Sequence, residues 1–255
     1  MANGSQIALG KGKSYQTRQA SSNGEKLVYT NGNTPVSAAY NYLTIPRGGQ
    51  FFVQLADGTK VWLNSESQLR YPVAFTDGKT REVELVYGEA YFEVSPSTVH
   101  KGARFKVLNK MQEVEVLGTQ FNIKAYKDET TIYTTLVEGK VAMNTVNAKV
   151  YLAPSQQANL NLKNLNLSIS RVDVYNEISW KKGIFSFERK PLKDIMVVLS
   201  RWYDVDVIFE NKTLENAKFI GILGKEQPIE EILTTIKATN IINNYKIEGK
   251  TIYIK

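Results

Sequence analysis

The chain has 255 residues, a net charge of +7, a single histidine and no cysteine. The absence of cysteine excludes disulfides, thiol nucleophiles and thiolate metal sites, and one histidine argues against imidazole metal sites and Ser-His catalysis. That residue, His100, stands in a polar, turn-like segment, where we expect it to be exposed. Basic residues are scattered among acidic ones, whereas a nucleic-acid-binding protein would gather them on a stripe or helix. We therefore expect no metal, no cofactor and no nucleic-acid partner.

Residues 1–40 are rich in Ser, Asn, Gly and Gln, with weak strand signals at Ile7–Leu9 and Lys26–Tyr29. This composition predicts a linker that leads into the first strands. The opening residues lack the apolar stretch of a signal peptide, and no segment approaches the 18 consecutive apolar residues of a membrane-spanning helix. We expect a membrane anchor, if the natural protein has one, to lie upstream.

Residues 41–172 read as many short strands rich in Val, Ile, Tyr, Phe and Thr. Asp57-Gly58 predicts a tight hairpin turn, because such turns need positive φ, which glycine takes without steric penalty. Similar turn-and-strand blocks follow at Asp77-Gly78, Tyr87-Gly88 and Glu138-Gly139, with Gly88 expected at a turn or bulge. Short strands with regular turns predict a mostly β domain, either a sandwich or a β-solenoid.

Four acidic residues in this region alternate with apolar ones: Glu82, Glu84, Glu113 and Glu115. Paired carboxylates are the machinery of glycosidases. Side chains spaced two residues apart, however, lie on the same face of a strand. Acids at this spacing, alternating with apolar residues, are typical of the solvent-exposed face of a sheet. We expect no catalytic residues here and no enzyme activity.

Residues 173–255 predict a small α+β domain. Pro191–Ile195 is echoed by Pro228–Ile232, and each opens a helical pattern with proline and acids in its first turn, where the missing N–H and the helix dipole favour them. Strand patterns flank both helices, which predicts two βαβ-like units with the helices on one face of a small sheet. Neither strand-to-helix turn is glycine-rich, so a nucleotide site is not supported.

The order of these blocks resembles the periplasmic region of FecR-type sigma-factor regulators over roughly residues 40–255. The β-rich blocks are PRGGQF (46–51), LADGTKVWLNSESQLRYP (55–72), VELVYGEAYFEV (83–94), FKV (105–107), VEVLGTQFNIKAY (114–126), TTLVEGKVAMN (134–144) and YLAPSQQA (151–158). Two later blocks resemble the family's C-terminal domain, whose fold is similar to the short N-terminal domain of secretins and TonB-dependent transducers: WKKGIFSFERKPLKDIMVVLSRWYDVDVIFE (180–210) and FIGILGKEQPIEEIL (219–233). Lys190, before Pro191, departs from the small polar residue that the family often has there.

The resemblance implies a function that the composition does not show. FecR-type proteins are single-pass inner-membrane anti-sigma regulators whose periplasmic part receives a signal from the N-terminal signalling domain of a TonB-dependent outer-membrane transducer. Their cytoplasmic region binds an extracytoplasmic-function sigma factor. That region and the membrane helix are absent from this sequence, so the chain is expected to be the periplasmic, signal-receiving part.

Sheet edges are the expected place for partner contact, because their unpaired backbone groups accept a further strand. The candidate edges are Lys218–Gly224, with Lys218, Ile220, Ile222 and Leu223, and Thr251–Lys255, with Thr251 and Tyr253. Core packing is the alternative for Ile220, Ile222 and Leu223. Val197, on the polar side of the first helix, is either a surface residue without a role or part of a contact.

Two other functions stay open. The 14 Tyr, 10 Phe and 3 Trp of this β-rich chain are compatible with a carbohydrate-binding or adhesive domain of a secreted or surface protein, which would need a ring of exposed aromatic residues on one sheet face. A hydrolase using a strand glutamate is the third possibility.

Overall fold

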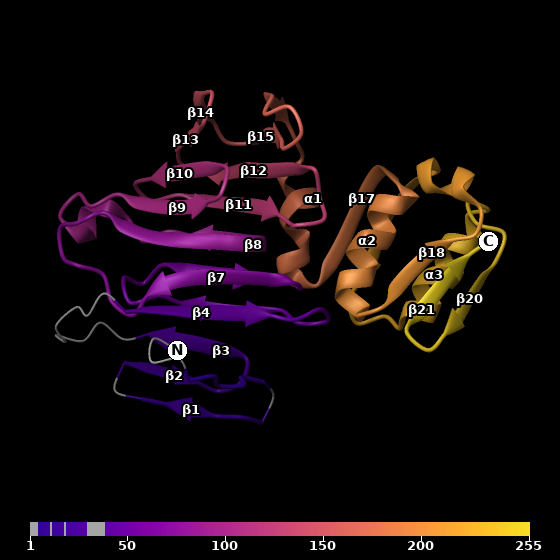
Figure 1. The fold of residues 1–255 in the computed structure, drawn as a ribbon, viewed down its shortest axis with the longest axis horizontal. Helices are drawn as coiled ribbons and strands as arrows, with labels where there is room; N and C mark the ends of the chain where they lie inside the picture. The colour runs from indigo at the N-terminus through magenta and orange to yellow at the C-terminus, as the bar shows by residue number, and fades with distance from the viewer. Residues whose placement is uncertain (1–4, 11, 18, 30–38) are drawn as a thin grey trace. The chain divides into compact units, whose positions relative to one another are not determined.

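The structure is a computed structural model that describes residues 5–10, 12–17, 19–29 and 39–255 (Figure 1). It consists of two compact units. The first, here called the β unit, comprises residues 1–45 and 50–174, and the second, the small unit, comprises residues 46–49 and 175–255. None of the described helices has the length and apolarity needed to cross a bilayer.

The described part of the β unit contains sixteen strands and the 3₁₀ turn η1 (Ser97–His100). The strands are β1 (Tyr15–Gln16), β2 (Ala20–Ser22), β3 (Lys26–Tyr29), β4 (Tyr40–Ile45), β5 (Phe51–Gln54), β6 (Lys60–Leu63), β7 (Ser67–Pro72), β8 (Arg81–Glu93), β9 (Phe105–Asn109), β10 (Gln112–Val116), β11 (Gln120–Ala125), β12 (Thr131–Glu138), β13 (Val141–Thr145), β14 (Lys149–Leu152), β15 (Gln156–Asn161) and β16 (Leu167–Arg171).

The long strand β8 takes part in two ladders of strands. One ladder runs β1-β2-β3-β5-β6-β8-β11-β12-β15-β16, and the other runs β4-β7-β8-β9-β10-β13-β14. The first half of β8 pairs with β7 and β9, and its second half pairs with β6 and β11. Side chains from both ladders form one apolar core, and most strand pairs are antiparallel, as in a sandwich and unlike a parallel solenoid. The predicted mostly β domain is confirmed.

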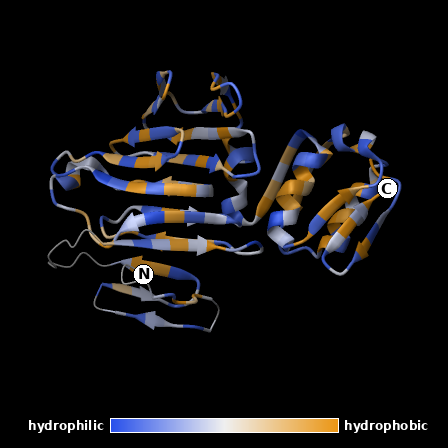
Figure 2. Ribbon diagram, in the orientation of Figure 1, coloured by the Kyte–Doolittle hydropathy of each residue, from blue (hydrophilic) through white to orange (hydrophobic). Residues whose placement is uncertain are grey.

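Alternation along the strands explains which face is buried. Figure 2 shows hydrophobic and hydrophilic residues following one another along strands such as β4 and β8. In β8 and β10 the apolar residues Val83, Leu85, Val114 and Val116 are at most 2 % exposed, while the acids between them face outward, as predicted. Burying each such side chain stabilises the fold by about 1.5–3 kcal/mol.

Two glycine-containing blocks behave differently. Asp57-Gly58 turns the chain from β5 to β6, with the Leu55 N–H donating to the Thr59 carbonyl at 2.8 Å, as the sequence predicts. Tyr87-Gly88 is not a turn, because β8 continues through it. Gly88 has φ +94°, and a Cβ there would lie 2.4 Å from the Cα of Ser67 on β7. The pairing of β7 with β8 shifts register nearby, so Gly88 serves a bulge.

The N-terminal lead-in is more than a linker. β1, β2 and β3 extend the first ladder, with β3 parallel to β5, and Ala20, Leu27 and Tyr29 enter the core. The strand signal at residues 26–29 is confirmed, whereas residues 7–9 form no strand. Residues 1–4, 11, 18 and 30–38 of the predicted linker lie outside the described residues.

The small unit is an α+β structure, as predicted. Its elements are α1 (Val174–Ile178), η2 (Ser179–Lys182), β17 (Ile184–Pro191), α2 (Leu192–Tyr203), β18 (Asp206–Phe209), η3 (Lys212–Asn216), β19 (Lys218–Gly224), α3 (Ile229–Ala238), β20 (Tyr245–Glu248) and β21 (Thr251–Ile254). Pro191 and Pro228 stand immediately before α2 and α3.

The prediction that both helices pack on one small sheet is wrong in the number of sheets. The strands form two sheets, β17-β19 and β18-β21-β20, so the two strands that flank α2 belong to different sheets. Both helices bury an apolar face, with Leu192, Ile195, Met196 and Leu199 of α2 at most 1 % exposed. Trp202 is buried as well and meets Phe185 edge-on, with ring centroids 4.6 Å apart. The helices therefore form the core of this unit together with buried strand residues such as Phe219 of β19 and Ile252 of β21.

Candidate partner-binding site

Strand β19 presents two large apolar side chains to solvent. Phe219 and Leu223 are each 2 % exposed, whereas Ile220 and Ile222 are 65 % and 67 % exposed. The period of two along a strand explains the split, because one face covers the core and the other does not. Core packing thus accounts for Leu223, and it does not account for Ile220 and Ile222.

The same strand has an unpaired edge. Among the described strands β19 pairs only with β17, antiparallel, with Ile222 opposite Ser186 and Gly221 opposite Phe187. An edge strand carries a row of backbone N–H and C=O groups that a further strand is able to bond. The sequence-based expectation of a sheet edge at residues 218–224 therefore agrees with the strand order.

The hydrogen bonds at the two ends of β19 identify which residues face this edge. The Ala217 carbonyl accepts from the Leu192 N–H at 2.8 Å, and the Lys225 N–H donates to the Gly183 carbonyl at 2.8 Å. In an antiparallel pair, alternate residues direct both backbone groups to the same neighbour. Since the odd-numbered residues bond towards β17, Ile220 and Ile222 direct their N–H and C=O groups to the open edge.

One end of the edge is closed by the chain itself. The Gly224 N–H, which also faces away from β17, donates to Oε1 of Gln227 at 2.9 Å. The open part of the edge is therefore Lys218–Ile222, with the exposed Lys218 at its start. Backbone groups and the two isoleucines lie on the same short segment.

The prediction that Thr251–Lys255 forms a second open sheet edge is wrong. β21 lies in the middle of its sheet, with β18 parallel on one side and β20 antiparallel on the other, so its backbone groups are already used. Thr251 and Tyr253 are half-buried on the outer face. Tyr253 stands opposite Ile208, which is 47 % exposed. The sequence analysis did not single out Ile208, because residues 207–209 form a continuous apolar run whose exposure alternates only in the structure.

Val197 gives no support for a contact. It is half-buried on α2, and its carbonyl accepts a hydrogen bond from the Ser200 hydroxyl at 2.9 Å. No described contact joins it to the open edge of β19.

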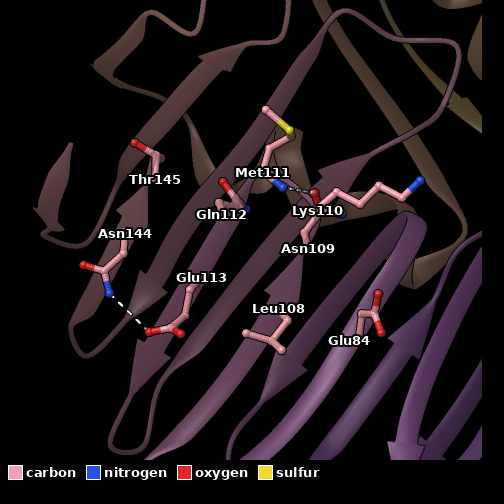
Figure 3. Close-up of a pocket in the computed structure, with 9 residues that line it drawn as sticks. All are labelled: Glu84, Leu108, Asn109, Lys110, Met111, Gln112, Glu113, Asn144 and Thr145. Carbon is pink, nitrogen blue, oxygen red and sulfur yellow. Dashed lines mark hydrogen bonds between the residues drawn. The ribbon is translucent and has the colours of Figure 1, made fainter. Parts of the chain in front are cut away.

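A shallow hollow of about 600 Å³ lies in the β unit around the β9–β10 turn (Figure 3). Two of the four acids considered for a glycosidase mechanism, Glu84 and Glu113, line this hollow. Arg70 donates to Glu84 at 3.2 Å, and Lys106 donates to Glu113 at 2.9 Å. The hydrogen bond from Lys106 lowers the pKa of Glu113. Both acids are thus ion-paired across strands.

The charged pair at the Asp57-Gly58 turn is fully buried. Arg81 donates to Asp57 at 2.7 Å, with both side chains 2 % exposed, and also to the carbonyls of Ser95 and Ala103. His100 was expected to be exposed, but it is half-buried, with Nε2 2.8 Å from the Ser95 hydroxyl. Burial, followed by the nearby Arg81 charge, lowers the pKa of His100. These groups hold the turn and η1 in place.

Glu89, at the centre of the β unit, is a second buried carboxylate. It accepts from the side-chain amides of Asn64 at 2.7 Å and Asn122 at 2.9 Å, and burial raises its pKa. The described residues contain no group of three or more His, Cys, Asp or Glu side chains arranged to hold a metal ion.

The most exposed aromatic residues of the described chain are spread over separate elements. In the described chain, the aromatic residues with the largest exposure are Tyr42, Tyr151 and Tyr175. They belong to β4, β14 and α1, and β4 and β14 lie at opposite ends of their ladder. Phe52, Trp62 and Tyr91 do form a row on one face of β5, β6 and β8, with ring centroids 4.8 Å and 5.8 Å apart. Phe52 and Trp62 are half-buried and Tyr91 is 1 % exposed, so this row is not the ring of exposed aromatic residues that the carbohydrate-binding alternative requires.

Comparison with known proteins agrees with the two-part architecture. Residues 41–142 match the FecR protein family and residues 184–254 match the FecR C-terminal family. Two crystal structures of a proposed anti-sigma factor from Parabacteroides distasonis are similar to this chain, each with a TM-score of 0.75 and 27 % identity over 84 % of this chain and 98 % of the other. No curated protein matches the chain. The resemblance seen in the sequence is confirmed, and the chain belongs to the FecR family of anti-sigma regulators.

Proposed function

We propose that this chain is the periplasmic, signal-receiving part of a transmembrane anti-sigma regulator. It relays a signal from the N-terminal signalling domain of a TonB-dependent outer-membrane transducer to an extracytoplasmic-function sigma factor, through protein–protein contact. Membership of the FecR family supports a regulatory role. The sigma factor is bound by a cytoplasmic region outside this chain, so the present residues act on the receiving side only.

The observation that carries the proposal is the open edge of β19 with its two exposed isoleucines. A strand from the transducer adds to this edge, bonding to the N–H and C=O groups of Ile220 and Ile222. Burial of the two isoleucine side chains adds about 1.5–3 kcal/mol each before the entropic cost of association. Directional backbone bonds and apolar side chains on one segment suit recognition of an extended partner strand.

The test removes one backbone donor from the edge. Ile222→Pro deletes an N–H that faces away from β17, and proline is tolerated on such an edge because no bond within the sheet is lost. The preceding residue, Gly221, also accommodates the conformation that proline requires. We expect the affinity for the signalling domain of the transducer encoded beside this protein to fall at least about tenfold, a loss of about 1.4 kcal/mol, measured by calorimetry.

A matched pair separates edge binding from general apolar contact. Ile222→Ser and Ile208→Ser each remove an exposed isoleucine of the small unit, but only Ile222 lies on β19. Ile222→Ser is expected to weaken binding and Ile208→Ser to leave it unchanged. Wild-type affinity in a folded Ile222→Pro variant, or no binding by the wild type, contradicts the proposal.

A further inference from the structure

The turn between β4 and β5 belongs to the small unit and not to the unit that surrounds it in sequence. Residues 46–49, Pro-Arg-Gly-Gly, cluster with residues 175–255, and the Gly49 N–H closes the turn on the Pro46 carbonyl at 3.2 Å. The contacts of residues 46–49 with α2 and β18 therefore lie inside the small unit.

Residues 46–49 lie against the C-terminal end of α2 and bond to its carbonyl groups. The Gly48 N–H donates to the Arg201 carbonyl at 2.7 Å, and Nη2 of Arg47 donates to the Ser200 carbonyl at 2.9 Å and to the Val205 carbonyl. The last carbonyls of a helix have no partner within it, and its C-terminus carries a partial negative charge. The Ser200 carbonyl also accepts from the N–H groups of Asp204 and Val205, so Arg47 adds a further donor there, while Gly48 bonds to the Arg201 carbonyl.

Arg47 also reaches the start of the next strand. Its Nη1 donates to Oδ1 of Asp206, the first residue of β18, at 3.0 Å, and its Nε lies 3.8 Å from Asp204, the left-handed residue that ends α2. A guanidinium presents several donors in a fixed fork, which lysine lacks. One side chain therefore holds both sides of the α2–β18 connection.

The end of α3 shows that this arrangement is specific to α2. There the N–H groups of Thr239 and Asn240 donate to the carbonyls of Ile236 and Lys237, and the Thr239 hydroxyl donates to Ile236 as well. Helix α3 is closed by the residues that directly follow it. Helix α2 is closed in the same way by the N–H groups of Asp204 and Val205, and it differs in that a turn about 150 residues earlier in the chain adds further bonds.

We propose that Arg47 is the positioning residue through which binding at the small unit is reported to β4 and β5, an inference that rests on the proposed function. β19 pairs with β17, β17 leads directly into α2, and the end of α2 is held by Arg47. The turn is continuous with β4, which ends at Ile45, and β5, which begins at Phe51. Any shift of α2 that a partner strand favours must therefore move the turn or break its bonds, and the coupling acts in both directions.

The first measurement needs no partner. Amide hydrogen exchange of the full chain is compared for wild type, Arg47→Lys and Arg47→Ala in peptides covering residues 199–207. We expect exchange at least fivefold faster in Arg47→Ala and an intermediate rate in Arg47→Lys, which keeps the charge but loses the fork. Arg70→Lys is the matched control, because Arg70 and Arg47 have nearly equal side-chain exposure, 31 % and 29 %, and Arg70 pairs with Glu84 within the β unit.

The second measurement adds the transducer's signalling domain and follows peptides covering residues 43–53. We expect the partner to change exchange there in wild type and Arg70→Lys, and to have no such effect in Arg47→Ala. Unaltered exchange at residues 199–207 in Arg47→Ala overturns the role of Arg47 regardless of the partner. A partner effect at 43–53 that persists in Arg47→Ala overturns the relay. If wild type does not bind the partner, the relay fails together with the proposed function, while the first measurement still judges the contact at α2.

Discussion

The two units of this chain use their polar and apolar groups in opposite ways. In the β unit, Asp57 and Arg81 are buried as a pair, and Glu84 and Glu113 of the solvated face are ion-paired across strands. In the small unit, β19 leaves an edge unpaired and two isoleucines exposed. The β unit also ends in unpaired strands, among them β4 and β14 with the exposed Tyr42 and Tyr151, but among the described strands only β19 places two exposed isoleucines on one open edge.

This comparison makes a general prediction about variants. Substitutions in the interior of the β unit lower its free energy of unfolding without changing the affinity of the small unit for the transducer, as long as the protein is folded. Substitutions on the β19 edge have the opposite effect. A buried β-unit variant that loses binding while fully folded breaks the comparison.

The largest effect is expected at Arg81. Arg81→Met removes the partner of Asp57 and leaves a carboxylate buried and uncompensated, which costs about 3–5 kcal/mol. Urea unfolding followed by circular dichroism measures the loss. Adding Asp57→Asn to Arg81→Met should recover part of it, because the buried charge is then gone. An Arg81→Met variant as stable as wild type would contradict the stabilising role of the Asp57–Arg81 pair.

The next effect is expected at Gly88. Gly88→Ala places a Cβ 2.4 Å from the Ser67 Cα and imposes a left-handed conformation on alanine, so we expect a loss of about 2–4 kcal/mol in thermal or urea unfolding. Gly102→Ala is the control, since Gly102 also has positive φ (+81°) but nothing lies within 4 Å of its Cβ position. It should lose only about 1–2 kcal/mol. Equal losses at the two sites argue against a close approach at the bulge.

The smallest effect concerns Glu89 and pH. Because burial raises its pKa in the folded state, the folded protein holds this proton more tightly than the unfolded chain. The resulting stabilisation is fully present below the unfolded pKa, about 4.3, and is lost as the pH rises through the folded value. The free energy of unfolding of wild type should thus fall relative to that of Glu89→Gln as the pH rises above about 4.3. Parallel curves contradict this titration.

Local patterns predicted the elements that depend on local rules. The Asp57-Gly58 turn follows from glycine's freedom, and the outward acids of β8 and β10 follow from period-two alternation. The same alternation places Ile220 and Ile222 on one face of β19, but it does not say which face the helices cover. That choice comes from the pairing with β17 and the packing of α2.

Features that join distant segments had no local signal. β21 is central because it pairs with β18, some 45 residues away, and strand order is not written into either strand. Asp57 lies in a turn, where the sequence alone predicts an exposed residue, and its burial depends on the ion pair with Arg81, 24 residues away, besides the two hydrogen bonds from Thr59. Arg47 lies in a turn of ordinary composition, and nothing in residues 46–49 indicates a contact with the end of α2.

The sharing of β8 between two ladders has a mechanical consequence. Both hydrogen-bond ladders pass through the same thirteen-residue backbone, so neither can be peeled from the other without tearing the strand they have in common. The β unit should consequently melt in one cooperative transition, with no stable half-unfolded form. A force applied at one end of the β unit should therefore move the unit as a whole, because the shared strand β8 prevents one ladder from sliding over the other.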